Sequence, residues 1–158
     1  MDRTEEDALV YSIGTVSKLL GVSEQTLRLY ERRGLILTHK SGGSQRRYSQ
    51  LDIERLRCIR DAITLHKISI EGIRRIQSMI PCWDYVQCSM EQRSTCPAYN
   101  TPEAGCWTYK HRNNACEDLD CRDCRVYHLA SDCKKVKSLI HDNAAPASLS
   151  TQHGQRRN

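Results

Sequence analysis

Cysteine is distributed very unevenly along the chain, and this constrains its folding more than any other feature. Before Pro81 there is one cysteine, Cys58. After Pro81, eight cysteines fall within 52 residues: Cys82, Cys88, Cys96, Cys106, Cys116, Cys121, Cys124 and Cys133. We therefore predict two small domains, residues 1–80 and 81–141. They are followed by a Ser/Ala/Gln-rich tail, residues 142–158, whose composition predicts disorder.

The charge and hydropathy of the chain indicate what kind of partner it has and where it is found. The net charge is +5, and residues 1–80 carry most of the excess, with 14 basic and 10 acidic side chains. This favours an anionic partner for the first half. The sequence has no apolar run of the length of a membrane helix and no signal-peptide core. We expect a cytoplasmic protein, in which dense cysteines bind metal or do redox chemistry more often than they form disulfides.

Residues 12–33 have the pattern of two short helices joined by a tight turn. Ser12 can cap the first helix and Gly21 can end it, while Ser23 can cap the second. Two helices joined in this way form a helix-turn-helix. The apolar positions that predict their inner faces are Ile13, Val16, Leu19, Leu20, Leu27 and Tyr30.

The following residues predict a β-hairpin wing and two further helices. Residues 35–37 are expected to form one strand and residues 45–48 the return strand. Ser49 and Asp52 form a capping box for a third helix. Ser69 caps a fourth helix that Pro81 closes. Residues 82–121 have no clean period, and a helical stripe returns over residues 122–140. The predicted class is mainly α: a winged helix-turn-helix domain, then a small irregular cysteine-rich metal-binding domain ending in a helix.

Four segments of the first half resemble the N-terminal domain of the MerR family of regulators: residues 13–23, 26–36, 46–49 and 52–56. The wing residues 42–48 and residues 68–73 are most similar to the heat-shock-repressor branch. The resemblance covers residues 11–80. It implies a homodimer that binds palindromic double-stranded promoter DNA and activates or represses transcription, with RNA polymerase as a further partner. No heptad run follows Pro81, so we expect the dimer contacts elsewhere, such as the 122–140 stripe.

The DNA-contacting residues follow from the docking geometry of such a domain. A helix fits the major groove, so outward polar side chains early in the second helix can reach base edges. We expect three residues there: Gln25, Thr26 and Arg28. Phosphates would be held by Tyr30, Arg46, Arg47 and Tyr48. The third-helix arginines, Arg55, Arg57 and Arg60, are expected on a solvated face.

The second half contains a short repeated motif. Cys82-Trp83 and Cys106-Trp107 each open a cysteine run, and Cys121-x-x-Cys124 follows. The pattern resembles the two-CW cysteine-rich modules joined to bacterial sensor and regulator domains, which implies a sensory accessory domain. In Cys-x-x-Cys, two sulfurs can reach the same ion. The expected ligands are Cys82, Cys88, Cys96, Cys106, Cys116, Cys121 and Cys124.

Three chemistries remain open for these cysteines: an iron–sulfur cluster, structural zinc, or a dithiol/disulfide switch. The spacing of Cys116, Cys121 and Cys124 matches that of plant-type [2Fe–2S] ferredoxins, which favours the iron–sulfur cluster. Cys58 and Cys133 are expected to be packed thiols. The histidines have no ligand spacing to cysteine and are expected on the surface: His111, His128 and His141.

The sequence favours a regulator over an enzyme, because it has no catalytic triad, phosphate loop or paired carboxylates. We expect promoter binding to be controlled by a cysteine-ligated cofactor that senses redox, oxygen or metal state. The alternatives are a constitutive DNA-binding protein with a structural zinc module, and an iron–sulfur electron-transfer protein. Colour after anaerobic purification would separate the iron–sulfur and zinc hypotheses.

Overall fold

The computed structural model describes residues 8, 10–40, 45–130 and 132. The first half holds β1 (Tyr11–Ser12), α1 (Ile13–Leu20), α2 (Glu24–Arg32), β2 (His39–Lys40), β3 (Arg46–Tyr48), α3 (Gln50–Thr64) and α4 (Ile70–Ser78). The second half holds α5 (Cys82–Val86), α6 (Met90–Ser94), α7 (Pro97–Asn100), the 3-10 helix η2 (Cys106–Thr108) and α8 (Arg125–Leu129). The predicted mainly α class is confirmed, and none of the described helices is long and apolar enough to cross a membrane.

Side-chain caps define the helix-turn-helix. Ser12 and Ser23 accept hydrogen bonds from the backbone N–H groups of Thr15 and Thr26, three residues into each helix. Gly21 ends α1 in the left-handed conformation, which glycine adopts without steric cost. The two predicted helices are therefore confirmed at both N-caps.

The wing differs from its prediction. Strand β2 begins at His39, not within residues 35–37, and it pairs antiparallel with β3. Leu35 and Ile36 are almost fully buried, so they serve as core residues rather than as strand residues of the wing. A short strand that was not predicted, β1, pairs with the other edge of β3, giving the order β1-β3-β2.

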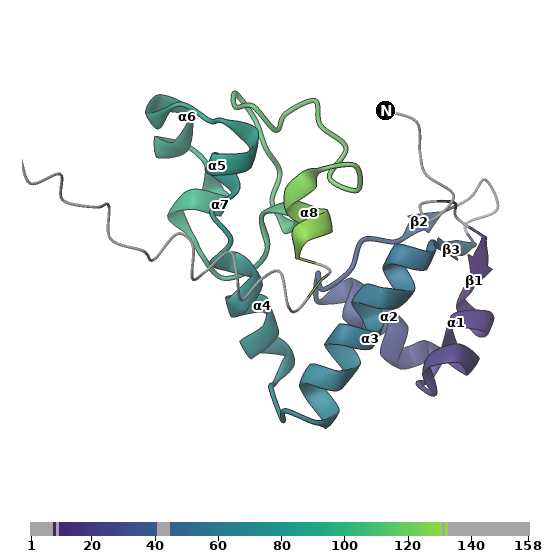
Figure 1. Cartoon of the computed structure of the whole chain (residues 1–158). Helices are drawn as coiled ribbons and strands as arrows, with labels where there is room; N and C mark the ends of the chain where they lie inside the picture. Colours follow the sequence, from purple (N-terminus) through teal and green to yellow (C-terminus); the bar gives the residue numbers. More distant parts are fainter. Residues whose placement is uncertain (1–7, 9, 41–44, 131, 133–158) are drawn as a thin grey trace, which may run out of the picture.

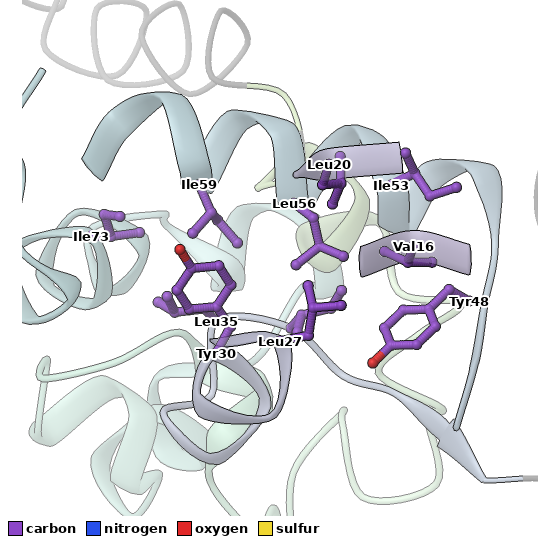
Figure 2. Close-up of a cluster of buried hydrophobic side chains, with 11 residues drawn as sticks. Val16, Leu20, Leu27, Tyr30, Leu35, Tyr48, Ile53, Leu56, Ile59 and Ile73 are labelled. Atoms are coloured by element: carbon purple, nitrogen blue, oxygen red, sulfur yellow. The ribbon is translucent and has the colours of Figure 1, made fainter. Parts of the chain in front are cut away.

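A single apolar cluster unites the first half. Figure 2 shows Val16, Leu27, Tyr30, Tyr48 and Leu56 among the side chains that point into it from α1, α2, β3 and α3. Burying such a side chain contributes about 1.5–3 kcal/mol relative to leaving it exposed. Helix α3 starts at the predicted Ser49–Asp52 capping box and α4 at the predicted Ser69 cap.

The second half is a set of short helices with a smaller core. Its buried cluster contains Ile80, Trp107, Val126, Tyr127 and Ala130, with four cysteines packed against it. In Figure 1, α8 lies between helices α5–α7 and the first half. The described part of the 122–140 stripe is thus buried inside this chain: Val126 is 1% exposed. Residues 131 and 133–140 of that stripe lie outside the described residues.

Candidate nucleic-acid interface and cysteine-rich module

The second helix presents a polar surface at its N-terminal end. Gln25 is exposed, and Thr26 and Arg28 are partly exposed. Thr26 bonds to the Ser23 cap, with 2.9 Å between the two hydroxyl oxygens. Arg28 pairs with Glu24 one turn earlier, at 3.1 Å. Of these three side chains, Gln25 has the greatest freedom to contact a base edge.

A hollow lies between the helix-turn-helix and the wing. It has a volume of about 480 Å³ and is open to solvent. Its lining residues are Ser12, Ile13, Gly14, Glu24, Arg28, Gln45 and Arg46. The structure thus brings Arg28 of α2 and Arg46 of β3 to one surface, although 18 positions separate them in the sequence. Two guanidinium groups beside a concave surface suit a phosphate backbone.

Arg46 is held in place by a carboxylate. Its Nε donates to Glu31 Oε2 at 2.5 Å, and the Thr38 hydroxyl donates to the other oxygen of Glu31 at 2.7 Å. Burial alone would raise the pKa of Glu31, but the hydrogen bonds from Thr38 and Arg46 outweigh it and lower the pKa below its ordinary value. Glu31 therefore stays charged at neutral pH and orients the wing arginine.

Two tyrosines expected at phosphates are buried instead. Tyr30 is 5% exposed, and Tyr48 is fully buried. Burial, followed by the negative charge of Glu31, raises the pKa of Tyr48 to about 12. The Tyr48 hydroxyl has no hydrogen-bond partner in the described part of the chain. Both rings belong to the core because α2 and β3 turn these positions inward, so the structure does not support their predicted phosphate contacts. Arg47 remains partly exposed.

Six of the seven predicted cysteine ligands influence one another electrostatically. Cys82 and Cys106 share a side-chain hydrogen bond, which lowers the pKa of Cys82 to about 7 against the effect of burial. The same hydrogen bond raises the pKa of Cys106, and so do burial and the negative charges of Cys82, Cys124 and Cys116. Cys82 is therefore the more acidic thiol of this pair.

Cys116 connects the remaining members of this group. Burial raises its pKa to about 12, and the charges of four other cysteines add to the effect: Cys88, Cys124, Cys82 and Cys121. Burial is the larger cause of this shift, and a charge adds to it only when it lies close to the thiol. The structure thus gathers thiols from five separate segments of the second half, and soft thiolates are the donors that zinc and iron–sulfur clusters prefer. No three His, Cys, Asp or Glu side chains of the described residues are arranged as ligands of a single metal ion.

Two cysteines are placed differently from this group. Cys96 is buried, and its Sγ lies 3.9 Å from Nδ1 of His111, whose Nε2 lies 2.9 Å from the carbonyl oxygen of Cys106. His111 is therefore not the surface residue we expected. Cys58 is disulfide-bonded, so its predicted role as a packed thiol is wrong. Cys133 and His141 lie outside the described residues.

Arg55 joins the two halves. It is 1% exposed, and its guanidinium carbon lies 3.5 Å from the centre of the Tyr127 ring and 5.2 Å from that of Trp107. It also donates to the carbonyl oxygens of Tyr127 and Leu35. A buried cation needs such partners, because its desolvation is costly. The prediction of a solvated face is thus wrong for Arg55, whereas Arg57 is exposed as expected. Arg60 is partly buried and donates to the carbonyl oxygen of Leu20 at 2.9 Å.

A second ion pair crosses the same boundary. Arg122 Nη2 donates to Asp52 Oδ2 at 2.8 Å, and that oxygen also accepts the Ser49 N–H of the α3 capping box. Burial would lower the pKa of Arg122, but Asp52 raises it overall. The helix cap that follows the wing is thus also a docking point for the second half.

The sequence did not lead us to expect that these residues join the two halves. A signal was present, because Asp52, Arg55 and Ile59 are spaced as one inward helix face, and an arginine on such a face needs a partner from another segment. For Tyr127, a helical stripe over residues 122–140 was predicted around it, but its burial against the first half was not.

Comparisons with known proteins identify the first half. Residues 11–80 match the family described as MerR HTH family regulatory protein. The chain is similar to the "Putative heat shock protein HspR" of Streptomyces coelicolor, with 42% identity over 71 residues, which is 45% of this chain and 47% of that protein. It is similar to the "HTH-type transcriptional regulator TnrA" of Bacillus subtilis, with 46% identity over 55 residues, or 35% of this chain and 50% of that protein.

A mercuric resistance operon regulator is also among the relatives. The "Mercuric resistance operon regulatory protein" of Pseudomonas fluorescens is 42% identical over 52 residues, which is 32% of this chain and 36% of that protein. The chain thus spans half or less of the length of these relatives. No solved structure matches the chain significantly.

Proposed function

We propose that this chain, whose residues 11–80 are a MerR-family helix-turn-helix domain, is a transcriptional regulator that binds double-stranded promoter DNA. The observation that carries the proposal is the hollow between α2 and the wing, where Arg28 and Arg46 meet. Helix α2 would enter the major groove and place Gln25 at base edges. Arg28, Arg46 and Arg47 would contact the phosphates on either side.

Symmetric DNA recognition is part of this proposal. A homodimer would read two half-sites one helical turn apart, and RNA polymerase would bind the same promoter. The buried position of Val126 removes the described part of the 122–140 stripe as a dimer surface, so the dimer would use another segment.

Selection from a pool of random duplex DNA tests DNA binding without knowledge of the promoter. We expect the full chain to enrich a palindromic sequence whose affinity falls steeply with salt concentration. The Gln25→Ala variant should accept more sequences at one position of each half-site. If the full chain enriches no sequence, DNA recognition is not its function.

We further propose that the second half holds a cysteine-ligated cofactor and that the cofactor controls DNA binding. Six grouped thiols support this: Cys82, Cys88, Cys106, Cys116, Cys121 and Cys124. Iron–sulfur cluster ligation is the first candidate, and structural zinc is the alternative. When bound, such a group supplies either a redox-sensitive centre or a rigid crosslink. The small apolar core of this half fits a domain that a cofactor stabilises.

Anaerobic purification followed by absorption spectroscopy and iron, sulfide and zinc analysis separates the candidates. An iron–sulfur protein is coloured, and a zinc protein is colourless. We expect Cys124→Ser to lose the cofactor. Cys96→Ser is the matched control and should retain it, because the Cys96 thiol faces His111. A parent protein that contains neither iron nor zinc would contradict the cofactor proposal and leave the DNA-binding proposal standing.

A further inference from the structure

The connector between α2 and the wing has its backbone bound by the second half. It comprises residues 34–37. The indole Nε1 of Trp107 donates to the carbonyl oxygen of Gly34 at 2.8 Å. The backbone N–H of Leu37 donates to the Tyr127 hydroxyl oxygen at 2.8 Å, and Arg122 donates to the carbonyl oxygen of Leu37. Three side chains of the second half therefore bind a segment that has no ladder hydrogen bonds of its own.

Each of these three side chains lies close in sequence to a grouped cysteine. Trp107 follows Cys106, Arg122 follows Cys121, and Tyr127 lies three residues after Cys124. Cys106, Cys121 and Cys124 also pack against the cluster that contains Trp107 and Tyr127. The three groups that hold the connector thus share backbone and packing contacts with these cysteines.

The other end of the connector leads to the DNA-facing hollow. Thr38 follows Leu37 directly and donates to Glu31, and Glu31 in turn holds Arg46 of the wing. The connector also fixes how β2 departs from α2, since it is the only covalent link between the recognition helix and the wing. Its position thus contributes, together with the Glu31–Arg46 ion pair and the β1–β3 pairing, to where Arg46 lies relative to Arg28.

We infer that the connector 34–37 transmits the state of the cysteine-rich module to the DNA-binding surface, with Trp107, Arg122 and Tyr127 as positioning residues. This inference rests on the proposed function. With the module folded, the connector is held and the wing arginine is oriented for DNA. When the module loses its cofactor and loosens, the three bonds are released and the wing gains freedom relative to α2. The DNA-binding conformation is then less populated, which lowers the apparent affinity.

The Trp107→Phe/Tyr127→Phe double variant tests the inference. It removes the Trp107 N–H that binds the Gly34 carbonyl oxygen and the Tyr127 hydroxyl that binds the Leu37 N–H, and it keeps an aromatic ring at both positions. Tyr109→Phe is the matched control, because its hydroxyl donates to the Thr101 carbonyl oxygen at 2.6 Å, inside the second half. Each full-length protein is compared with and without its cofactor, which is removed by chelation. The measurements are metal content, hydrogen exchange of the Leu37 amide and affinity for the selected duplex DNA.

We expect the double variant to retain its metal and to exchange the Leu37 amide faster than the parent. Each bond is worth roughly a factor of 2–10, so the loss of DNA affinity on chelation should shrink by roughly fivefold or more relative to the parent. The Tyr109→Phe control should respond as the parent does. If the double variant keeps its metal and its full response to chelation, the connector does not carry the signal and the inference is overturned.

Failure of the proposed function gives a different result. A parent without metal, or with the same DNA affinity before and after chelation, overturns cofactor control. In that case the double variant still tests the connector through its DNA affinity alone. An affinity equal to that of the parent, with faster Leu37 exchange, would overturn the inference on its own.

Discussion

The two halves of this molecule reach a folded state by different routes. The first half buries eleven core residues in one cluster that α1, α2, β3, α3 and α4 share. The cluster of the second half contains five buried residues, one of which is Ile80 at the boundary, and cysteines and loops surround it. A regular apolar stripe supplies enough buried surface to hold helices together, whereas short helices without such a stripe need crosslinks or a docking partner. The second half uses Arg55 and Asp52 of the first half as that partner.

The largest effect expected from this difference is selective loss of the second half on cofactor removal. Thiolate–metal bonds supply on the order of 10 kcal/mol of folding free energy in small metal-dependent domains. Chelation should therefore abolish amide protection in residues 82–130, while α1, α2 and α3 stay protected. Hydrogen exchange measured by mass spectrometry on both forms checks this. Equal protection of both halves after chelation would mean that docking alone suffices.

Breaking the docking contact at Arg55 should have the next largest effect. Arg55→Ala removes the cation from the Tyr127 and Trp107 rings and leaves carbonyl acceptors at Leu35 and Tyr127 without that donor. We expect a loss of about 3 kcal/mol in the free energy of unfolding. Arg57→Ala, on the exposed face of the same helix, should change it by less than about 0.5 kcal/mol. Urea denaturation of both variants makes the comparison, and equal effects would contradict the role of Arg55.

Arg47 of the wing should affect DNA binding without affecting stability, because its side chain is partly exposed. Arg47→Ala would remove the proposed phosphate contact, so we expect weaker binding to all duplexes and a salt slope reduced by about one. Lys110→Ala, in an exposed position of the second half, is the charge-matched control and should bind as the parent does. Salt-titrated binding assays measure both. A weaker Lys110→Ala variant would place the second half on the DNA as well.

The smallest expected effect is the change in folding stability when Glu31 is protonated at acidic pH. Because its pKa is lowered in the folded state, its stabilising contribution is fully present above the ordinary value of 4.5 and is lost as the pH falls through the folded pKa. The parent should therefore lose stability as the pH falls below 4.5, and the Glu31→Gln variant should lack this part of the pH dependence. Thermal unfolding across that range measures it. A parallel pH dependence in parent and variant would show that Glu31 is not linked to folding.

Sequence reasoning succeeded where local chemistry decides the structure. The Ser12, Ser23 and Ser69 caps and the Ser49–Asp52 box were predicted, because a cap depends only on residues within one turn. Residues 35–37 read as a strand because they are apolar, yet tertiary burial of Leu35 and Ile36 overrides that preference. Arg55 read as surface, because a single sequence does not reveal an aromatic partner 72 positions away.

The same limit applies to the candidate sites. Gln25, Arg28, Arg46 and Arg47 were proposed as DNA contacts from helix position and wing charge, and they stay a prediction. Tyr30 and Tyr48 were misplaced, because an amphipathic tyrosine suits both a core and a phosphate. The grouping of the cysteines depends on how α5, η2 and α8 pack, and residues 82–121 contain no period from which that packing follows.

Gly34 has a consequence for how such proteins arise and can be recombined. It adopts a φ of +71°, and a Cβ at this position would lie 2.5 Å from Cγ2 of Thr108. The turn that ends the recognition helix must therefore be glycine for two unrelated reasons, one within each half. A cysteine-rich module of this type can be transplanted only onto a DNA-binding domain that already has glycine there. A designer of chimeric regulators can keep the fusion boundary at Pro81, provided that the recipient DNA-binding domain carries residues 34–37 of this chain, of which Leu35 and Ile36 belong to its own core.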